Sequence, residues 1–395
     1  MPRAGRLARR SLVLEHRVKR LLLVLLAAAS LAACSPARGL EAWRLLDDLR
    51  AGWGPSALKA ATPTPARSPV AYRVGDRRRA GDLYRPGGPA EAALVLVPGA
   101  APEGKDDPRL VAVAHALARV RFLVLVPEIA NMRDLKIRPE DAGAIADALR
   151  HLAARHDTPG EDVGLVAISY AAGPAMIAAL EPDLRTRVRF LAAVGGYYDI
   201  DALATFFTTG RYRAGPELPW QSATPNPYGK WIFLRSNAER VERPRDRVLL
   251  IAMAERKLDN LRAPLDDLAA RLGAEGRAVY ALLVNRDPDA VPGLIAGLPP
   301  GVRQDMEALD LKRRDLAALR TRVLLIHGRD DAVIPFTESE ALAAALGRDR
   351  AALTVVDNLA HVDLGPGGFS DSLRLWRAAY RVLSLRDQGV KPRAR

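Results

Sequence analysis

The chain has a single cysteine in 395 residues, and this scarcity excludes two kinds of protein. One cysteine can build neither a disulfide framework nor a four-cysteine zinc site. Aromatic residues are also few, at 5%, and no segment of the sequence repeats along the chain. Hydrophobic residues make up 49% and charged residues 27%. This balance excludes intrinsic disorder, a coiled coil and a multi-span membrane protein, and predicts one large globular domain with an insertion.

Sequence signatures for nucleotides, nucleic acids and metals are missing as well. Gly99 and Gly104 belong to neither a G-x-G-x-x-G fingerprint nor a P-loop, so no nucleotide is expected. The net charge is +13, but no recognition helix, zinc finger or RNA-binding signature accompanies it, so we expect no nucleic-acid partner. His115, His151 and His156 have no carboxylate or cysteine at metal spacing. We therefore expect no metal and no cofactor.

The N-terminus combines a basic start with a short apolar run. Residues 21–33 would span about 20 Å as a helix, less than the roughly 30 Å hydrocarbon core of a bilayer. Residues 1–33 are therefore predicted to be a signal peptide. The run ends Leu31-Ala-Ala-Cys34, which resembles the lipobox of bacterial lipoproteins and implies that Cys34 is lipidated. A general secretory signal is the alternative. Under the lipoprotein interpretation the protein is anchored on the periplasmic side of the bacterial envelope, and Ser35 favours the outer membrane.

Residues 34–69 are predicted to be a tether with one short helix. Four apolar residues recur in it at helical spacing: Leu40, Trp43, Leu46 and Leu49. Glycines and prolines interrupt the remainder, so we expect no core of its own in this segment. The folded domain is predicted to begin at about Val70.

From there the chain alternates between apolar runs and helical stretches. A hairpin is predicted at 70–74 and 81–84. Six further apolar runs predict strands: 93–97, 122–126, 163–168, 188–194, 322–326 and 352–356. Five stretches predict helices: 108–120, 139–156, 170–181, 337–346 and 371–386. Wholly apolar strands that alternate with amphipathic helices are typical of a buried, mostly parallel sheet flanked by helices, the α/β class.

This alternation stops between residues 200 and 318, where we predict an inserted, largely helical cap. The segment contains Pro- and Gly-rich turns and helical runs at 261–272 and 302–309. Aromatic residues cluster at 197–233, and they are expected to form the cap's own core, to line a pocket, or both. The predicted division of the folded chain is as follows: core, 70–199 and 319–388; cap, 200–318; basic tail, 389–395.

A serine lies where the 163–168 strand turns into the next helix. In Ala167-Ile-Ser169-Tyr-Ala171, small residues stand two before and two after the serine. A nucleophile elbow needs such flanks, because the backbone doubles back and a larger side chain would collide. Glycine is usual at both flanks, so the alanines make this motif looser. A serine that only caps the helix is the alternative.

Polar motifs also follow the last two predicted strands. His327-Gly-Arg-Asp330-Asp331 comes after the first of them, and Asp357-Asn-Leu-Ala-His361 comes after the second. Parallel strands bring their carboxyl ends to one sheet edge, where open α/β sheets place their ligands. A serine nucleophile needs a base, and a histidine base needs a carboxylate to orient it. All three residue types follow in the order Ser, Asp, His. His327 is predicted to be a packed core histidine.

Together these motifs resemble the α/β-hydrolase superfamily, from about residue 70 to 385. The resemblance implies the α/β-hydrolase fold, with Ser169 as nucleophile and His361 as base. In the family's acid loop the aspartate lies three residues after the glycine, which selects Asp331 rather than Asp330.

The oxyanion hole is also implied by this resemblance. Val97-Pro-Gly-Ala100 stands where the family has its oxyanion loop, so one donor would be the backbone N–H of Ala100. The other donor would be the N–H of Tyr170.

The resemblance thus implies a serine hydrolase that cleaves a carboxylic ester through an acyl-enzyme. The expected partners are a small-molecule ester or acyl substrate and, through the lipid anchor, a membrane. The aromatic-rich cap favours short to medium apolar acyl groups. A thioesterase, peptidase or acyltransferase would use the same triad. The alternative from another class is a non-catalytic binding or scaffold lipoprotein that has kept the fold.

Overall fold

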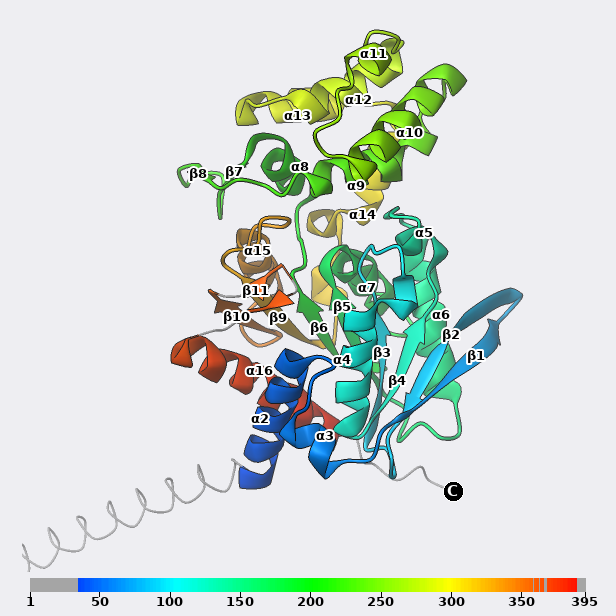
Figure 1. Cartoon of the computed structure of the whole chain (residues 1–395), viewed down its shortest axis with the longest axis vertical. Coiled ribbons are helices and arrows are strands. Elements are labelled where there is room, and N and C mark those ends of the chain that lie inside the picture. The colour runs from blue at the N-terminus through cyan, green and yellow to red at the C-terminus, as the bar shows by residue number, and fades with distance from the viewer. Residues whose placement is uncertain (1–34, 358, 362, 366–367, 389–395) are drawn as a thin grey trace, which may run out of the picture.

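The computed structural model describes residues 35–388 except 358, 362, 366 and 367. The predicted signal peptide, Cys34 and the basic tail lie outside the described residues. The main sheet has eight strands in the order β1-β2-β4-β3-β5-β6-β9-β10 (Figure 1). Strand β2 runs antiparallel to both of its neighbours, and all pairs from β4 to β10 are parallel. This mostly parallel sheet, flanked by helices, confirms the predicted α/β-hydrolase fold.

The strands lie within a few residues of their predicted bounds, because the apolar runs of the central strands are buried on both faces of the sheet. Their observed bounds are β1 (Ala66–Val74), β2 (Arg77–Arg85), β3 (Ala92–Val97), β4 (Phe122–Pro127), β5 (Val163–Ile168), β6 (Val188–Val194), β9 (Arg322–Gly328) and β10 (Ala351–Val356). All six residues of β3 are buried. Alternate side chains along a strand therefore contribute to two separate cores, one on each face.

Helices cover both faces of the sheet. One face packs against α6 (Asp141–Ala154), α7 (Ala172–Ala179) and α15 (Thr337–Leu346). The other packs against α2 (Pro36–Ala51), α4 (Pro108–Arg119) and α16 (Phe369–Asp387). Among the described helices, none is both long and apolar enough to cross a bilayer.

The prediction of a tether before residue 70 is wrong for most of that segment. Helix α2 packs against α16 and α4 and buries Ala42, Leu45 and Leu46. The short helix α3 (Ala57–Ala61) follows, and β1 already begins at Ala66. The first half of the predicted stripe is wrong, since Leu40 and Trp43 are 52% and 49% exposed, whereas Leu46 is buried and Leu49 packs against the core. The small, fully buried Ala42 is what lets this helix approach the domain closely.

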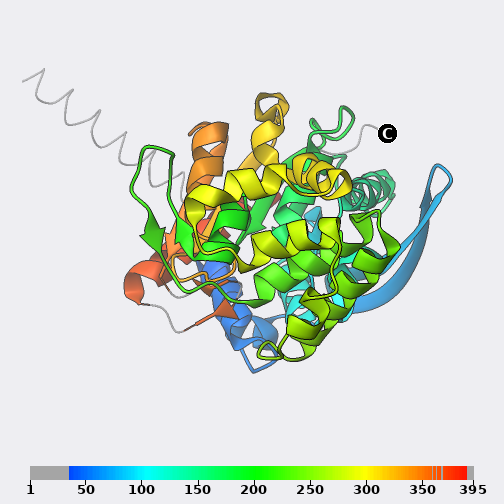
Figure 2. The ribbon, with the colours of Figure 1, turned by 90° about the horizontal axis from the view of Figure 1, so that it is seen from above.

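The insertion between β6 and β9 forms a helical cap over one end of the sheet (Figures 1 and 2). Its helices are α8 (Ile200–Thr209), α9 (Tyr228–Asn237), α10 (Pro244–Asp259), α11 (Asp266–Ala269), α12 (Ala274–Val284), α13 (Val291–Ala296) and α14 (Pro300–Leu309). A short hairpin, β7 (Arg211–Tyr212) and β8 (Gln221–Ser222), follows α8. The predicted helix at 261–272 is wrong, because the chain turns after α10 and only α11 is helical there.

The cap has a hydrophobic core of its own, separate from the two cores of the sheet. Among its aromatic residues, Phe206, Phe207 and Trp231 are buried. Tyr228 instead lines the cavity described below. Both expectations for the aromatic cluster therefore hold, for different residues.

Candidate active site

Ser169 lies at a sharp turn between β5 and α7. Its φ angle is 59°, in the left-handed region that non-glycine residues rarely occupy. Such a conformation costs about 1–3 kcal/mol and persists only where the surrounding structure enforces it. The flanking Ala167 and Ala171 are both fully buried, so alanine is accommodated at these positions of the turn. Glycine is required at Gly173 instead, since a Cβ there would lie 1.9 Å from the Tyr197 hydroxyl.

The structure brings Ser169, His361 and Asp331 into one hydrogen-bonded chain. The Ser169 Oγ lies 2.7 Å from His361 Nε2, and His361 Nδ1 lies 2.9 Å from Asp331 Oδ2. A carboxylate can only accept, so Nδ1 carries the proton and Nε2 is free to accept from the serine hydroxyl. Asp330, by contrast, is exposed. The register of the acid loop in the structure therefore brings Asp331 to the histidine.

The turn that carries His361 follows β10 and lies between the short strands β11 (Leu359–Ala360) and β12 (Asp363–Leu364). His361 itself has a φ of 56°, so both the serine and the histidine occupy the left-handed region. The backbone at Gly328 approaches this turn closely, because a Cβ there would lie 1.8 Å from the Leu359 carbonyl oxygen. A glycine at position 328 is thus needed for the turn that carries His361 to pack against the end of β9.

Asp331 is buried, and four donors surround its carboxylate. Oδ1 accepts hydrogen bonds from the backbone N–H groups of Val333 and Ile334, at 2.8 and 3.0 Å. Oδ2 lies 2.9 Å from His361 Nδ1 and 3.3 Å from His327 Nε2. Burial by itself raises the pKa of Asp331, but the hydrogen bonds from the two histidines outweigh it and lower the pKa far below its ordinary value. The carboxylate is therefore ionised at neutral pH.

His327 is fully buried, as expected for a core histidine, but it also contacts the candidate acid. Its Nε2 faces two acceptors, Asp331 and the Ile334 carbonyl oxygen at 2.9 Å, so Nε2 carries the proton. Its Nδ1 lies 2.7 Å from the Ser339 Oγ. The sequence analysis gave His327 no role toward Asp331. Its position at the end of the strand that leads into the acid loop was the available signal.

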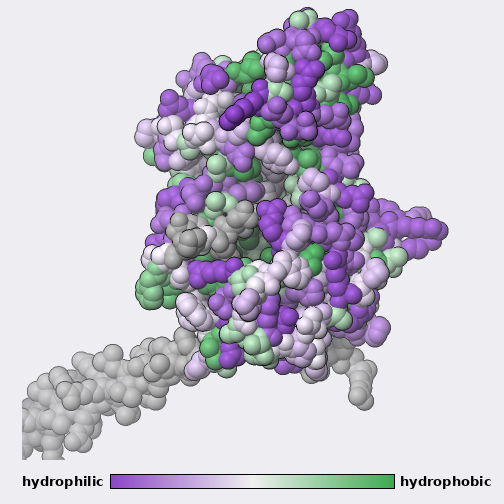
Figure 3. Space-filling model, in the orientation of Figure 1, coloured by the Kyte–Doolittle hydropathy of each residue, from purple (hydrophilic) through white to green (hydrophobic). Residues whose placement is uncertain are grey.

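Ser169 and His361 line a cavity of about 500 Å³ between the core and the cap. The cap contributes Asn226, Tyr228 and Ile232 to its wall. Most of the molecular face in Figure 3 is hydrophilic, and hydrophobic residues appear on it only in small separate groups.

Burial and the charge of Glu103 raise the pKa of Tyr228, so its hydroxyl stays protonated and can donate to a bound molecule.

The two residues of the predicted oxyanion hole both line this cavity. Ala100 lies in the loop after β3, and Tyr170 follows the serine. A Cβ on Gly99 would lie 3.4 Å from the Ser169 Cβ, so this loop packs against the elbow. Within the described part of the chain, the Ala100 N–H donates no hydrogen bond. Tyr170 directs its ring beneath the cap, toward Tyr197, with ring centroids 6.3 Å apart.

The described residues contain no group of three or more His, Cys, Asp or Glu side chains that could hold a metal ion.

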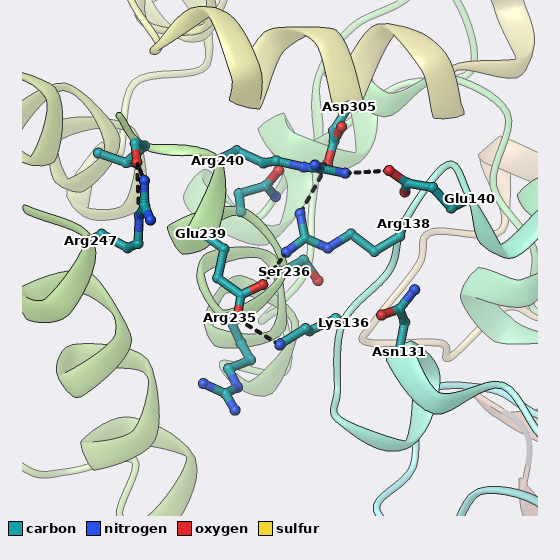
Figure 4. Close-up of polar contacts among 12 residues, drawn as sticks. Asn131, Lys136, Arg138, Glu140, Arg235, Ser236, Glu239, Arg240, Arg247 and Asp305 are labelled. Carbon is teal, nitrogen blue, oxygen red and sulfur yellow. Dashed lines mark hydrogen bonds and ion pairs between the residues drawn. The ribbon is translucent and has the colours of Figure 1, made fainter. Parts of the chain in front are cut away.

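Ion pairs join the core to the cap beside this site, in a cluster that we call the seam (Figure 4). Its six charged residues are Lys136, Arg138, Glu140, Glu239, Arg240 and Asp305. Arg138, from the loop before α6, bridges to Asp305 at 3.1 Å and to Glu239 at 2.8 Å. Arg240 of the cap also forms an ion pair with Asp305, with its Nε 2.6 Å from Oδ2. Its Nη2 forms a second ion pair with Glu140 of the core, 2.7 Å from Oε1. Lys136 completes the seam through Glu239.

Strand order and site geometry define this chain as having the α/β-hydrolase fold. No family model matches the sequence, and no curated protein is significantly similar to it. Among solved structures, the chain is similar to the rice cell wall degrading esterase LipA from Xanthomonas oryzae, with 16% identity and a TM-score of 0.49 over 82% of this chain and 92% of that one. A puromycin-hydrolyzing peptidase from Mycobacterium tuberculosis has 15% identity and a TM-score of 0.45 over 82% of this chain.

This chain spans only 40% of the length of that peptidase. At these TM-scores and identities, neither likeness carries an argument about activity. What the site does has to be inferred from its own residues.

Proposed function

We propose that this protein is a serine hydrolase that cleaves carboxylic esters. One observation carries the proposal: Ser169, His361 and Asp331 form an unbroken hydrogen-bonded chain at the wall of a cavity large enough for a small substrate. A serine hydroxyl becomes a nucleophile when a neighbouring base can take its proton, and here the base lies 2.7 Å away.

In the proposed reaction, Ser169 attacks the ester carbonyl while His361 Nε2 takes its proton. The buried, ionised Asp331 keeps the proton of the neutral histidine on Nδ1 and stabilises the imidazolium that forms. The N–H groups of Ala100 and Tyr170 stabilise the negative oxygen of the tetrahedral intermediate. His361 then protonates the departing alcohol. Water releases the acid from the acyl-enzyme by the same steps, so no cofactor is required.

Thioesters and amides are attacked by the same machinery, and the cavity lining supports the choice of an ester with an apolar acyl group. The cap side of the cavity presents Tyr228 and Ile232 beside Asn226, Ile168 precedes the serine, and the charged lining residues Glu103, Asp107, Arg109 and Asp330 come from the core. Each methylene buried against such a surface contributes about 0.8 kcal/mol. Short to medium acyl chains are therefore the proposed substrates.

The test is a fluorophosphonate probe together with a panel of p-nitrophenyl esters of increasing acyl length. The purified wild-type chain is expected to take up one probe per molecule and to hydrolyse the shorter esters. Ser169→Ala should lose both activities and keep its thermal unfolding midpoint, because the change removes one oxygen. A wild-type protein that takes up no probe and hydrolyses no ester, thioester or amide would instead be a binding or scaffold protein.

For location, we propose that Cys34 carries the lipid of a bacterial lipoprotein. The support is the lipobox-like Leu31-Ala-Ala-Cys34 at the end of a short apolar run. Metabolic labelling with a fatty acid should mark the wild-type chain and leave Cys34→Ala unmarked. An unlabelled wild-type chain would contradict the proposal.

A further inference from the structure

A second, smaller cavity lies beneath the cap and borders the cavity that holds Ser169. Its volume is about 50 Å³, and its walls come from the cap helices α8, α9 and α14, the loop before α6, and the segments that follow β5 and β6. Among the described residues, two line both cavities: Tyr170, which follows the nucleophile, and Ile232 of α9. We call the smaller space the cap pocket.

The interior of the cap pocket offers mainly apolar contacts. Four of its polar residues already use their side chains in bonds within the protein: Ser236 with the Ile137 N–H, Tyr197 with the Leu309 carbonyl oxygen, Asn237 with the Phe233 carbonyl oxygen, and Asp305 with Arg138 and Arg240. Most of the other lining residues are aliphatic or aromatic. A group that enters this space therefore gains from the burial of hydrocarbon and finds few free polar partners.

Ile232 closes the catalytic cavity on the side of the cap pocket. Its side chain is 1% exposed and packs in a hydrophobic cluster with Ile137 and Leu309, which both line the cap pocket. Ala100, in the loop of the predicted oxyanion hole, and Tyr170 pack against the same cluster. The apolar wall at Ile232 therefore begins beside the immediate neighbours of the nucleophile and ends at the cap pocket.

Tyr170, the other shared residue, is more constrained than Ile232. Its backbone belongs to the turn that carries Ser169, and α9 lies close to its ring, since a Cβ on Gly229 would lie 3.6 Å from the Tyr170 hydroxyl. Ile232 contributes to the boundary from the cap. A change at this position therefore alters the boundary and leaves the nucleophile turn in place.

We propose that Ile232 sets the length of the acyl chain that the active site accepts. This inference rests on the proposed ester hydrolysis and specifies its substrates as linear acyl esters whose chain ends against Ile232. The acyl chain follows the apolar side of the catalytic cavity past Tyr170, and the Ile232 side chain keeps it out of the cap pocket. With a smaller side chain at this position the two cavities join, and a longer chain fits.

The test measures kcat/KM on p-nitrophenyl esters from acetate to laurate. Each methylene that gains burial contributes about 0.8 kcal/mol, which is about fourfold in kcat/KM. Ile232→Ala removes most of the boundary side chain, so the preferred acyl chain should lengthen by about three carbons, and preference for that ester should rise about tenfold or more. Ile232→Phe should shorten the preferred chain. Ile232→Val is the milder variant in case Ile232→Ala does not fold.

Leu234→Ala on the same helix is the matched control. Leu234 is fully buried in the cap core and lines neither cavity, so this truncation loosens α9 without opening the boundary. The variant should keep the chain-length profile of the wild type. An equal shift in Leu234→Ala would assign the change to a loosened cap and overturn the inference.

A filling variant tests whether the added room is the cap pocket. Leu203 of α8 lines the cap pocket but not the catalytic cavity, so Leu203→Phe alone should keep the wild-type profile. Combined with Ile232→Ala, it should cancel the gain on long esters. A gain that survives this filling, or an unchanged profile in Ile232→Ala, overturns the inference and leaves the proposed function standing. A wild-type chain that hydrolyses no ester of the panel overturns both.

Discussion

The candidate triad and the seam between core and cap are held together in different ways. Ser169 and Asp331 are 6% and 5% exposed, and every member of the triad is supplied by the core. The seam joins two parts of the chain, and several of its ions face solvent, with the side chains of Glu140 and Glu239 63% and 42% exposed. Buried hydrogen bonds fix a geometry, whereas exposed ion pairs are weak and screened by salt.

This difference assigns separate roles to the two regions. The three triad residues lie at strand ends of the core, and the cap contacts the acid loop through a hydrogen bond from the Asn226 N–H to the Ala332 carbonyl oxygen at 2.6 Å. The cap supplies one wall of the cavity, and the outer ion pairs of the seam that attach it, such as Arg240 with Glu140, are open to solvent. Under the proposed function, changes in the cap would alter acyl-group selection while the triad is preserved.

The largest effect should come from the acid of the triad. Asp331→Asn keeps the size of the side chain but removes the charge and favours the wrong histidine tautomer, so kcat should fall about 10⁴-fold. Asp330→Asn is the matched control, because this adjacent residue lines the cavity but is exposed and forms no hydrogen bond or ion pair with the triad among the described residues, and it should change kcat less than about threefold. Both variants are measured on the best p-nitrophenyl ester. If Asp330→Asn were the damaging change, the acid in solution would be the other aspartate.

The second-largest effect concerns Glu338, a buried residue of α15 that lies where the chain leaves the core for the cap. Its Oε2 accepts hydrogen bonds from the backbone N–H groups of Tyr198 and Asp199, where the chain leaves the core. Burial raises the pKa of Glu338 to about 7, and the charges of Asp199 and Asp310 add to this, against the lowering effect of the two hydrogen bonds. The folded state thus holds this proton more tightly than the unfolded chain does.

The consequence is a loss of stability as the pH rises from about 4.5 to about 7, with no further change from this group above that. The difference between about 7 and the ordinary 4.5 corresponds to about 3 kcal/mol. Urea unfolding of wild type and Glu338→Gln at several pH values measures it. The difference in unfolding free energy between the two chains should change across this range, and a constant difference would contradict the prediction.

The third effect lies in the seam, where the ions are not equally exposed. The side chain of Arg138 is only 6% exposed and that of Asp305 12%, so the centre of the seam is buried like the triad. Arg138→Met should lower the free energy of unfolding by about 2 kcal/mol, because it removes a charged hydrogen bond from Asp305, which is mostly buried, and a second one from the more exposed Glu239. Glu140→Gln, at the exposed rim, should cost less than about 1 kcal/mol.

The two variants should also differ in how their loss of stability depends on the salt concentration. Raising the salt concentration should shrink the cost of Glu140→Gln and leave that of Arg138→Met nearly unchanged, because buried pairs are screened less. Urea unfolding at low and high salt makes the comparison. Equal salt dependence in both variants would mean that Arg138 is solvated in solution.

The sequence predicted the parts of the fold and site that depend on local patterns. Apolar runs such as Val163–Ile168 gave the strands, and the elbow and acid-loop motifs brought Ser169 and Asp331 to the same sheet edge. The packing of α2 was missed because its buried stripe depends on Ala42, whose small side chain gives a weak hydrophobic signal.

No pattern in the sequence predicted the contacts between segments that are far apart in the chain. Arg138 and Asp305 are 167 residues apart, and nothing near either of them indicates a partner. Charged residues are abundant in this chain, so their pairing follows from the folded positions and not from composition. His327 is an intermediate case, since it lies close to Asp331 in sequence, but its contact depends on how the acid loop folds back.

The smallest loss of turnover should come from His327, which we expect to be a positioning residue for the acid of the triad. Its Nε2–H is one of four donors around the Asp331 carboxylate, and its hydrogen bond helps to lower the pKa of that group. His327→Leu removes this donor, so the carboxylate is less firmly oriented toward His361 and its pKa rises. A hydrogen bond to a charged group is worth about 1.5 kcal/mol at the low end, which corresponds to about a tenfold lower kcat with KM nearly unchanged. His327→Gln, whose side-chain amide can donate in place of Nε2, is the matched control and should recover most of the loss. If both variants lose stability equally and neither changes kcat below its unfolding temperature, His327 serves packing alone.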